Sequence, residues 1–278
     1  MVIGIVENLY SSYDFTNKAL KSFSDWLILI FINLMAVAGA LLIFCGVFGM
    51  IISALSAYNL PTMTSNSMVL GDPISSSMTS AFAMAGIFSM VFIGLGIILA
   101  LIFGILLTGV QIRAYRGGEF TLGSYGGMFL DGLLATIISF IYFIPYIIIS
   151  ILLNFGPMMN PAYVIASMII EIVVMIVTML FYLMAVIRFA KVQKFSAAFE
   201  LKEILNVIST IGWLTYIVNI IVVGIVILVI YLILALIPVV GWGLLIVVMP
   251  FLIIWEARFF GALYESATAT KEIEPASP

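Results

Sequence analysis

One carboxylate lies in the middle of a long apolar run, IASMIIEIVVMIVTM, which spans residues 165–179. This acid, Glu171, follows Pro161 by ten residues, so in a helix it lies about 15 Å from the helix start. Asn219 occupies a similar depth in a later apolar run. An ionised acid in apolar surroundings is costly, which favours its neutral form. Two roles are open: a hydrogen-bonded cluster that fixes helix packing, or uptake and release of a proton or cation during transport.

The residue types that most catalytic and metal sites need are missing or too few. The chain has no histidine, the commonest general base and a common zinc ligand, and a single cysteine, Cys45. Metalloprotease motifs, phosphate-binding glycine loops and the G-x-S-x-G motif do not occur. In DGLLAT, Thr136 stands where a lipid-headgroup transferase motif needs arginine, so we interpret Asp131 as a helix-start residue beside the positive end of the helix dipole. We therefore predict no enzymatic activity, no metal and no cofactor.

The composition indicates that a bilayer, and not water, surrounds most of the chain. Of its 278 residues, 65% are hydrophobic and 8% are charged, against about 45–50% and about 25% in soluble domains. A helix needs roughly 20 apolar residues to cross a membrane. We predict one all-α membrane domain over residues 1–278, with an external loop at 56–81 and a polar tail at 266–278. The six predicted spans are 26–55, 82–112, 133–153, 161–187, 207–237 and 242–263.

The basic residues predict how the chain is oriented in the membrane. All ten precede the first span, follow the second or fourth, or close the sixth: Lys18, Lys21, Arg113, Arg116, Arg188, Lys191, Lys194, Lys202, Arg258 and Lys271. Cytoplasmic loops retain Lys and Arg, so both termini are expected in the cytoplasm of a cell whose plasma membrane holds the protein. We expect Arg113, Arg116, Arg188 and Lys191 to reach lipid headgroups. The net charge of −3 gives no basic surface for nucleic acid.

An internal repeat divides the predicted spans into pairs. Residues 112–121, IRAYRGGEFT, align without gaps with residues 187–196, IRFAKVQKFS, and a fainter copy is ARFFGALY at 257–264. This spacing predicts three helical hairpins. Amphipathic interfacial helices are expected before the first and fifth spans. The first would be capped by Asp14, and the second, over 194–208, would present the apolar positions Ala198, Leu201, Leu205 and Ile208.

Small residues recur at four-residue spacing in the second span, at Gly96, Ala100, Gly104 and Thr108. Such a stripe lets two helix backbones approach closely. It predicts packing against another span of the chain, with homodimerisation as the alternative.

Three stretches together resemble a known family. They are GVQIRAYRGGEF with FLDGLLATIISFIYFIPYIII, then IRFAKVQKFSAAFELKEIL, then ALIPVVGWGLLIVVMPFLIIWEARFFGALY. They resemble domain of unknown function 4013, a prokaryotic and often archaeal family of membrane proteins. The resemblance covers most of the chain from about residue 100 onward, and the Ser/Thr-rich external segment departs from it. It implies an integral membrane protein but supplies no activity and no site residues.

These observations lead to two hypotheses about function. The first is a non-enzymatic component that organises the membrane or envelope and contacts lipids and an unidentified membrane or cytoplasmic protein, with homo-oligomerisation left open. The second is a small secondary transporter or permease that uses Glu171 with Asn219 as an intramembrane site.

Overall fold

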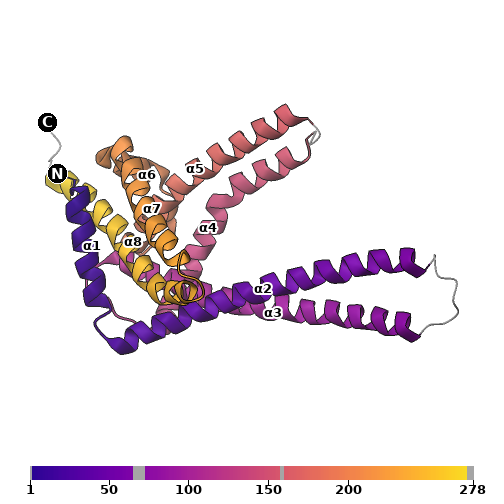
Figure 1. The fold of residues 1–278 in the computed structure, drawn as a ribbon. Helices are drawn as coiled ribbons and strands as arrows, with labels where there is room; N and C mark the ends of the chain where they lie inside the picture. Colours follow the sequence, from indigo (N-terminus) through magenta and orange to yellow (C-terminus); the bar gives the residue numbers. More distant parts are fainter. Residues whose placement is uncertain (1, 65–72, 157–159, 274–278) are drawn as a thin grey trace. The chain divides into compact units, whose positions relative to one another are not determined.

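The computed structural model describes residues 2–64, 73–156 and 160–273, and within these ranges all regular secondary structure is helical. The all-α prediction is therefore confirmed. The elements are α1 (Ile5–Ala19), α2 (Phe23–Thr64), α3 (Pro73–Arg116), α4 (Tyr125–Asn154), α5 (Pro161–Val192), the 3-10 turn η1 (Phe195–Phe199), α6 (Leu201–Ile211), α7 (Trp213–Ala235) and α8 (Val240–Ile273) (Figure 1).

Six helical segments of the described chain are long and apolar enough to cross a membrane. They are Phe23–Leu55, Met84–Arg116, Tyr125–Asn154, Pro161–Val192, Trp213–Ala235 and Val240–Ala269, and the shortest has 23 residues. A helix suits this solvent because it satisfies every backbone N–H and C=O within its own segment. The chain is a multi-pass membrane protein.

The helices extend beyond several predicted boundaries. Helix α2 continues to Thr64 and α3 begins at Pro73, so residues 56–64 and 73–81 of the predicted external loop are helical; its centre, 65–72, lies outside the described residues. Helix α8 likewise continues to Ile273, into the predicted tail.

The predicted fifth span, 207–237, is in fact two helices, because Gly212 has a φ of 88° between α6 and α7. Glycine adopts this conformation without the steric cost of a side chain.

The chain divides into two compact units, one of which is Phe31–Gly104. In this unit α2 and α3 pack through small residues. A Cβ added at Gly39 would lie 2.6 Å from the backbone nitrogen of Ala100, and one added at Gly96 would lie 2.7 Å from the carbonyl oxygen of Gly39. Two members of the predicted small-residue stripe therefore form a close helix contact within the chain.

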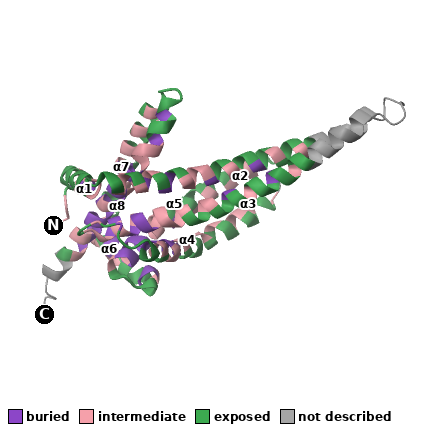
Figure 2. Cartoon of the chain, turned by 90° about the horizontal axis from the view of Figure 1, so that it is seen from below, coloured by how far each residue is buried: buried purple, intermediate pink, exposed green. Residues whose placement is uncertain are grey.

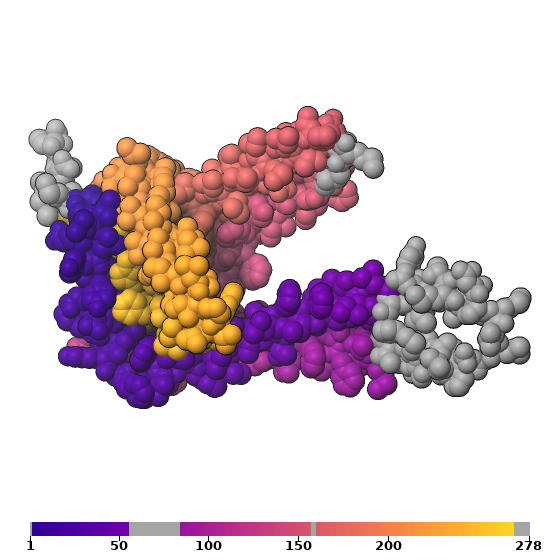
Figure 3. Space-filling model, in the orientation of Figure 1, coloured from indigo at the N-terminus to yellow at the C-terminus, as the bar shows by residue number. Residues whose placement is uncertain are grey.

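The other unit, Met1–Ile30 with Ile105–Pro278, contains most of the buried core. Buried residues gather around α6 and α8, as Figure 2 shows, and most of the outer parts of α4 and α5 are exposed. Helix α1 packs along α8, so the two ends of the described chain lie side by side (Figures 1 and 3). The core thus lies toward the ends of the spans that carry the basic residues.

Helix α1 contacts α8 through its polar side. The structure also corrects the prediction that Asp14 caps this helix. The buried residues of α1 are Asn8, Ser12 and Thr16. The Asn8 amide donates to the Phe259 carbonyl oxygen at 3.0 Å. Asp14 is not a helix cap, because the helix already begins at Ile5 and the Asp14 carboxylate pairs instead with Lys18, one turn later, at 2.6 Å on the exposed side.

Helix α6 and the 3-10 turn before it bury two of the four predicted apolar positions, Ala198 and Ile208. The buried residues of α6 are Ile204, Val207, Ile208 and Ile211. Leu201 and Leu205, which were assigned to the apolar face, are exposed. The prediction treated residues 194–208 as one helix, whereas η1 ends at Phe199 and a new helix begins at Leu201. The break changes the rotation of the following residues about the helix axis.

Candidate functional site

The structure does not bring the predicted pair Glu171 and Asn219 together. Glu171 lies on α5 and accepts a hydrogen bond from the Ser150 hydroxyl of α4, with an oxygen-to-oxygen distance of 3.4 Å. Asn219 lies on α7, is buried, and donates to the Thr215 carbonyl oxygen of its own helix at 2.7 Å. Glu171 thus makes a helix-to-helix contact between α4 and α5, and its chain neighbours Ile170 and Ile172 are exposed.

The basic residues at the helix ends form ion pairs that the sequence did not reveal. At the end of α3, the Arg116 guanidinium makes two hydrogen bonds to the Asp131 carboxylate of α4, at 2.8 and 2.7 Å. The interpretation of Asp131 as a helix-start residue is wrong, because α4 already begins at Tyr125. Asp131 therefore lies inside the helix, where it faces the end of α3 and neutralises Arg116.

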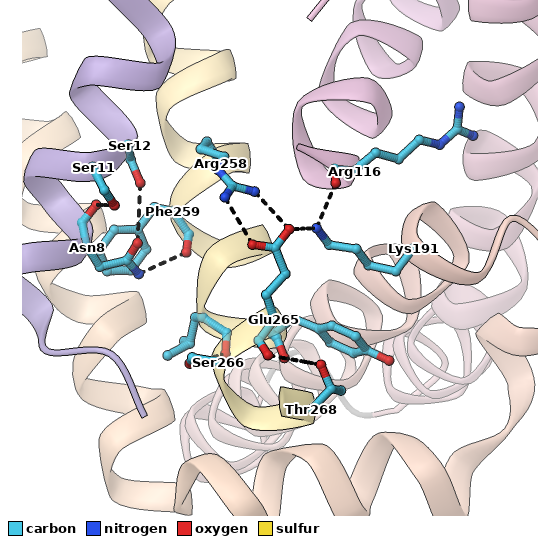
Figure 4. Close-up of polar contacts among 12 residues, drawn as sticks. Asn8, Ser11, Ser12, Arg116, Lys191, Arg258, Phe259, Glu265, Ser266 and Thr268 are labelled. Atoms are coloured by element: carbon cyan, nitrogen blue, oxygen red, sulfur yellow. Dashed lines mark hydrogen bonds and ion pairs between the residues drawn. The ribbon is translucent and has the colours of Figure 1, made fainter. Parts of the chain in front are cut away.

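Glu265 of α8 is the centre of the second set of ion pairs. Its carboxylate accepts two hydrogen bonds from Arg258, both at 3.0 Å, and pairs with Lys191 of α5. Lys191 also donates to the Arg116 carbonyl oxygen at 2.9 Å (Figure 4). Arg116 in turn donates through Nε to the Ala190 carbonyl oxygen at 3.1 Å. We call Arg116, Asp131, Lys191, Arg258 and Glu265 the span-end network; it joins α3, α4, α5 and α8.

The span-end network brings the two copies of the internal repeat into contact. Arg116 and Lys191 occupy equivalent positions of the two copies, and each contacts the backbone at the end of the other's helix. The network reaches α1 as well, because the Arg258 guanidinium lies 5.2 Å from the centre of the Phe15 ring. Such a cation–π contact adds to the packing of α1 on α8.

The remaining predicted headgroup contacts, Arg113 and Arg188, also bind within the chain. Arg113 donates to the carbonyl oxygens of Thr121 and Ser124, at 2.9 and 2.7 Å. Arg188 pairs with Glu200 and donates to the Tyr264 hydroxyl at 3.3 Å. The sequence identified the cations but not their acid partners. Contact of these cations with lipid headgroups stays a prediction.

A cavity of about 270 Å³ lies among α3, α5, α7 and α8. Most of its walls are apolar side chains, and its polar lining residues are Gln111, Tyr115, Tyr182 and Glu256. The Gln111 amide donates to the Tyr115 hydroxyl at 3.2 Å. Glu256 is followed two residues later on α8 by the cation Arg258. Side chains two residues apart on a helix point in different directions, and Arg258 binds Glu265 instead.

The arrangement of acidic side chains favours charge pairing over metal chemistry. Within the described ranges, no three Asp, Glu or Cys side chains are grouped so that they could hold a metal ion. Two of the acids, Asp131 and Glu265, each accept two hydrogen bonds from one arginine. Glu256 is different because it lines a cavity.

Comparison with known proteins identifies the family. The model of a family described as proteins of unknown function (DUF4013) matches residues 92–239, just over half of the chain. The matched part includes most of the helices that line the cavity and three of the five residues in the span-end network. No curated protein and no solved structure matches the chain. The match confirms the resemblance seen in the sequence, and the chain belongs to the DUF4013 family of proteins of unknown function.

Proposed function

We propose that this chain is a non-enzymatic component of the plasma membrane that organises its surroundings through the membrane bundle and its cytoplasmic face. The observation that carries the proposal is the span-end network. Its two carboxylates, Asp131 and Glu265, are each held by arginine. A carboxylate paired in this way is a poor general base, because the cation favours its ionised form and occupies its lone pairs. The network therefore serves to hold the ends of the spans together.

The same ends carry the basic residues, which supports a cytoplasmic position for them and for both termini. The exposed apolar side chains of α4 and α5, among them Ile141, Ile148, Ile169 and Ile176, are suited to contact with lipid chains. A membrane or cytoplasmic protein is the second expected partner. The net charge of −3 gives no reason to expect nucleic acid.

The proposed orientation can be tested by labelling single cysteines. Cys45 is first replaced by serine, and one cysteine is introduced at Ala162 or at Ser196, both of which are exposed. A membrane-impermeant maleimide applied to intact cells is expected to label A162C at once. It should label S196C only after the membrane is permeabilised, because Ser196 belongs to the segment with four basic residues. Labelling of S196C in intact cells would contradict the orientation.

The proposed role can be tested by extracting the protein from its membrane in polymer-bounded lipid discs. We expect an assembly of constant composition that is larger than the 30.4 kDa monomer with its lipid belt. Proteoliposomes that contain the purified chain should hold an imposed proton gradient as well as protein-free vesicles do. A monomer in the discs, together with a gradient that collapses in the presence of the protein, would contradict the proposal.

A small carrier is the second candidate, and one observation favours it. The cavity lined by Glu256 supplies an intramembrane carboxylate next to space for a solute. The pair first considered, Glu171 with Asn219, does not supply this, because each of the two makes its hydrogen bond elsewhere. In the proteoliposome experiment, collapse of the gradient that Glu256→Gln prevents and Glu171→Gln does not would establish the carrier.

A further inference from the structure

We infer that the cavity among α3, α5, α7 and α8 is a binding site for a small organic ammonium ion, whose nitrogen pairs with Glu256. This goes beyond the proposed function, because a ligand site is compatible with an organising protein and with a carrier. The inference starts from the position of the acid. Glu256 is half-buried and lines a cavity whose other walls come from four helices.

A positively charged ligand supplies the counter-charge that the described ion pairs do not give to Glu256. The ion pairs among the described side chains use Asp14, Asp131, Glu200 and Glu265, and not Glu256. The nearest cation in sequence, Arg258, is held by both carboxylate oxygens of Glu265. An ionised acid in apolar surroundings without a counter-charge is costly. A cation that enters the cavity offsets that cost, so the site selects positive charge.

The lining favours an organic ammonium ion over a metal ion. Ca²⁺ takes six to eight oxygen ligands and Mg²⁺ about six, and this cavity has one carboxylate among mostly apolar walls. The rings of Tyr115, Tyr182 and Phe260 line it, and aromatic rings attract organic cations. The Gln111 amide nitrogen already donates to Tyr115, which leaves its carbonyl oxygen to accept an N–H from the ligand.

The size of the cavity sets the size of the ligand. Its volume of about 270 Å³ lies just below the range of about 300–1,000 Å³ that is typical of small-molecule sites. A short alkyl chain on a primary ammonium group meets these conditions: the nitrogen donates up to three hydrogen bonds, and the chain contacts the apolar walls. One wall contains Gly224, where an added Cβ would meet no atom within 4 Å. A larger side chain at this position would start from a residue that lines the cavity and would meet no backbone at its Cβ.

The test measures binding of n-butylammonium to the purified full-length chain in lipid nanodiscs, by equilibrium dialysis in phosphate buffer, since Tris is itself an amine. We expect saturable binding at one site per chain, and none of the neutral analogue n-butanol. Glu256→Gln should weaken binding about tenfold or more, because it removes the charge from the acceptor. Glu171→Gln is the matched control: it neutralises another intramembrane acid and should bind as the wild type does.

A second variant tests the site without touching the acid. Gly224→Leu should abolish binding by filling the cavity, and Gly94→Leu, made on α3 where a Cβ also meets no atom within 4 Å, should not. If Glu256→Gln fails to fold, as judged by circular dichroism and size exclusion, the glycine pair decides the question. Equal binding by wild type and Gly224→Leu, no saturable binding to the wild type, or equal binding of n-butanol would overturn the inference. None of these results depends on whether the protein organises a membrane assembly.

Discussion

Replacing Glu265 by glutamine should lower the free energy of unfolding by about 2 kcal/mol. This carboxylate accepts hydrogen bonds from Arg258 and Lys191, whose side chains are only 20% and 14% exposed. The glutamine amide has one acceptor oxygen, and its NH₂ group would face cations that can only donate. Because Glu265 is itself 42% exposed, water can reach the two cations, so the cost stays below the roughly 3–5 kcal/mol measured for fully buried pairs.

The measurement is unfolding of the purified protein in mild detergent with increasing sodium dodecyl sulfate, followed by circular dichroism. Glu119→Gln is the control, since Glu119 is exposed in the connection between α3 and α4. It makes the same chemical change and should leave the unfolding midpoint unchanged. If the two variants unfold together, the pairs at Glu265 contribute nothing, and the span-end network would no longer explain how α5 and α8 are held together.

The sequence was sufficient for the properties that depend on local composition. The six spans follow from the length of each apolar run, because the bilayer thickness is fixed. The family was visible in motifs such as FLDGL, which lies within the matched residues. Helix ends were less accurate. The chain continues as helix through residues 56–64 and 73–81, although Ser, Thr and turn-forming residues there indicated a loop.

Which side chains meet in the candidate site depends on how each helix is rotated about its own axis. Apolar runs do not reveal that rotation. Depth placed Glu171 and Asn219 at similar levels, but Glu171 faces α4 and Asn219 bonds within α7. A helix that is apolar on all sides has no pattern that marks which side faces the bundle. Glu256 was not among the predicted site residues; it lies two residues from Arg258, a spacing that points the two side chains apart.

The acid partners of the basic residues were missed for a different reason. Arg116 and Asp131 are 15 residues apart, and Lys191 and Glu265 are 74 apart. Pairs so distant in sequence come together only through the packing of several helices. One signal was available: the repeat made Arg116 and Lys191 equivalent, and equivalent helix ends of a repeat often lie together. In the structure each of the two cations contacts the backbone at the end of the other's helix, and they pair with different acids, Arg116 with Asp131 and Lys191 with Glu265.

Gly132→Ala is expected to destabilise the protein by about 3 kcal/mol or more, which is the largest effect of any substitution considered for this chain. Gly132 is buried on α4, and a Cβ added there would lie 1.9 Å from the carbonyl oxygen of Ile105 on α3. Gly109 shows the reverse contact, with its added Cβ 2.0 Å from the Met128 carbonyl oxygen. Both obstacles are backbone atoms of a helix, which cannot turn aside as a side chain would, so the helices must separate.

Separation of α3 from α4 also strains the bonds between Arg116 and Asp131, which span the same pair of helices. We therefore expect Gly132→Ala to shift both the unfolding midpoint and the size-exclusion profile. Gly126→Ala is the matched control on α4, because an added Cβ meets no atom within 4 Å there. It should be neutral, or stabilising by up to about 1 kcal/mol, since alanine favours a helix more than glycine does. Equal stability of the two variants would show that α3 and α4 do not approach as closely as these glycines require.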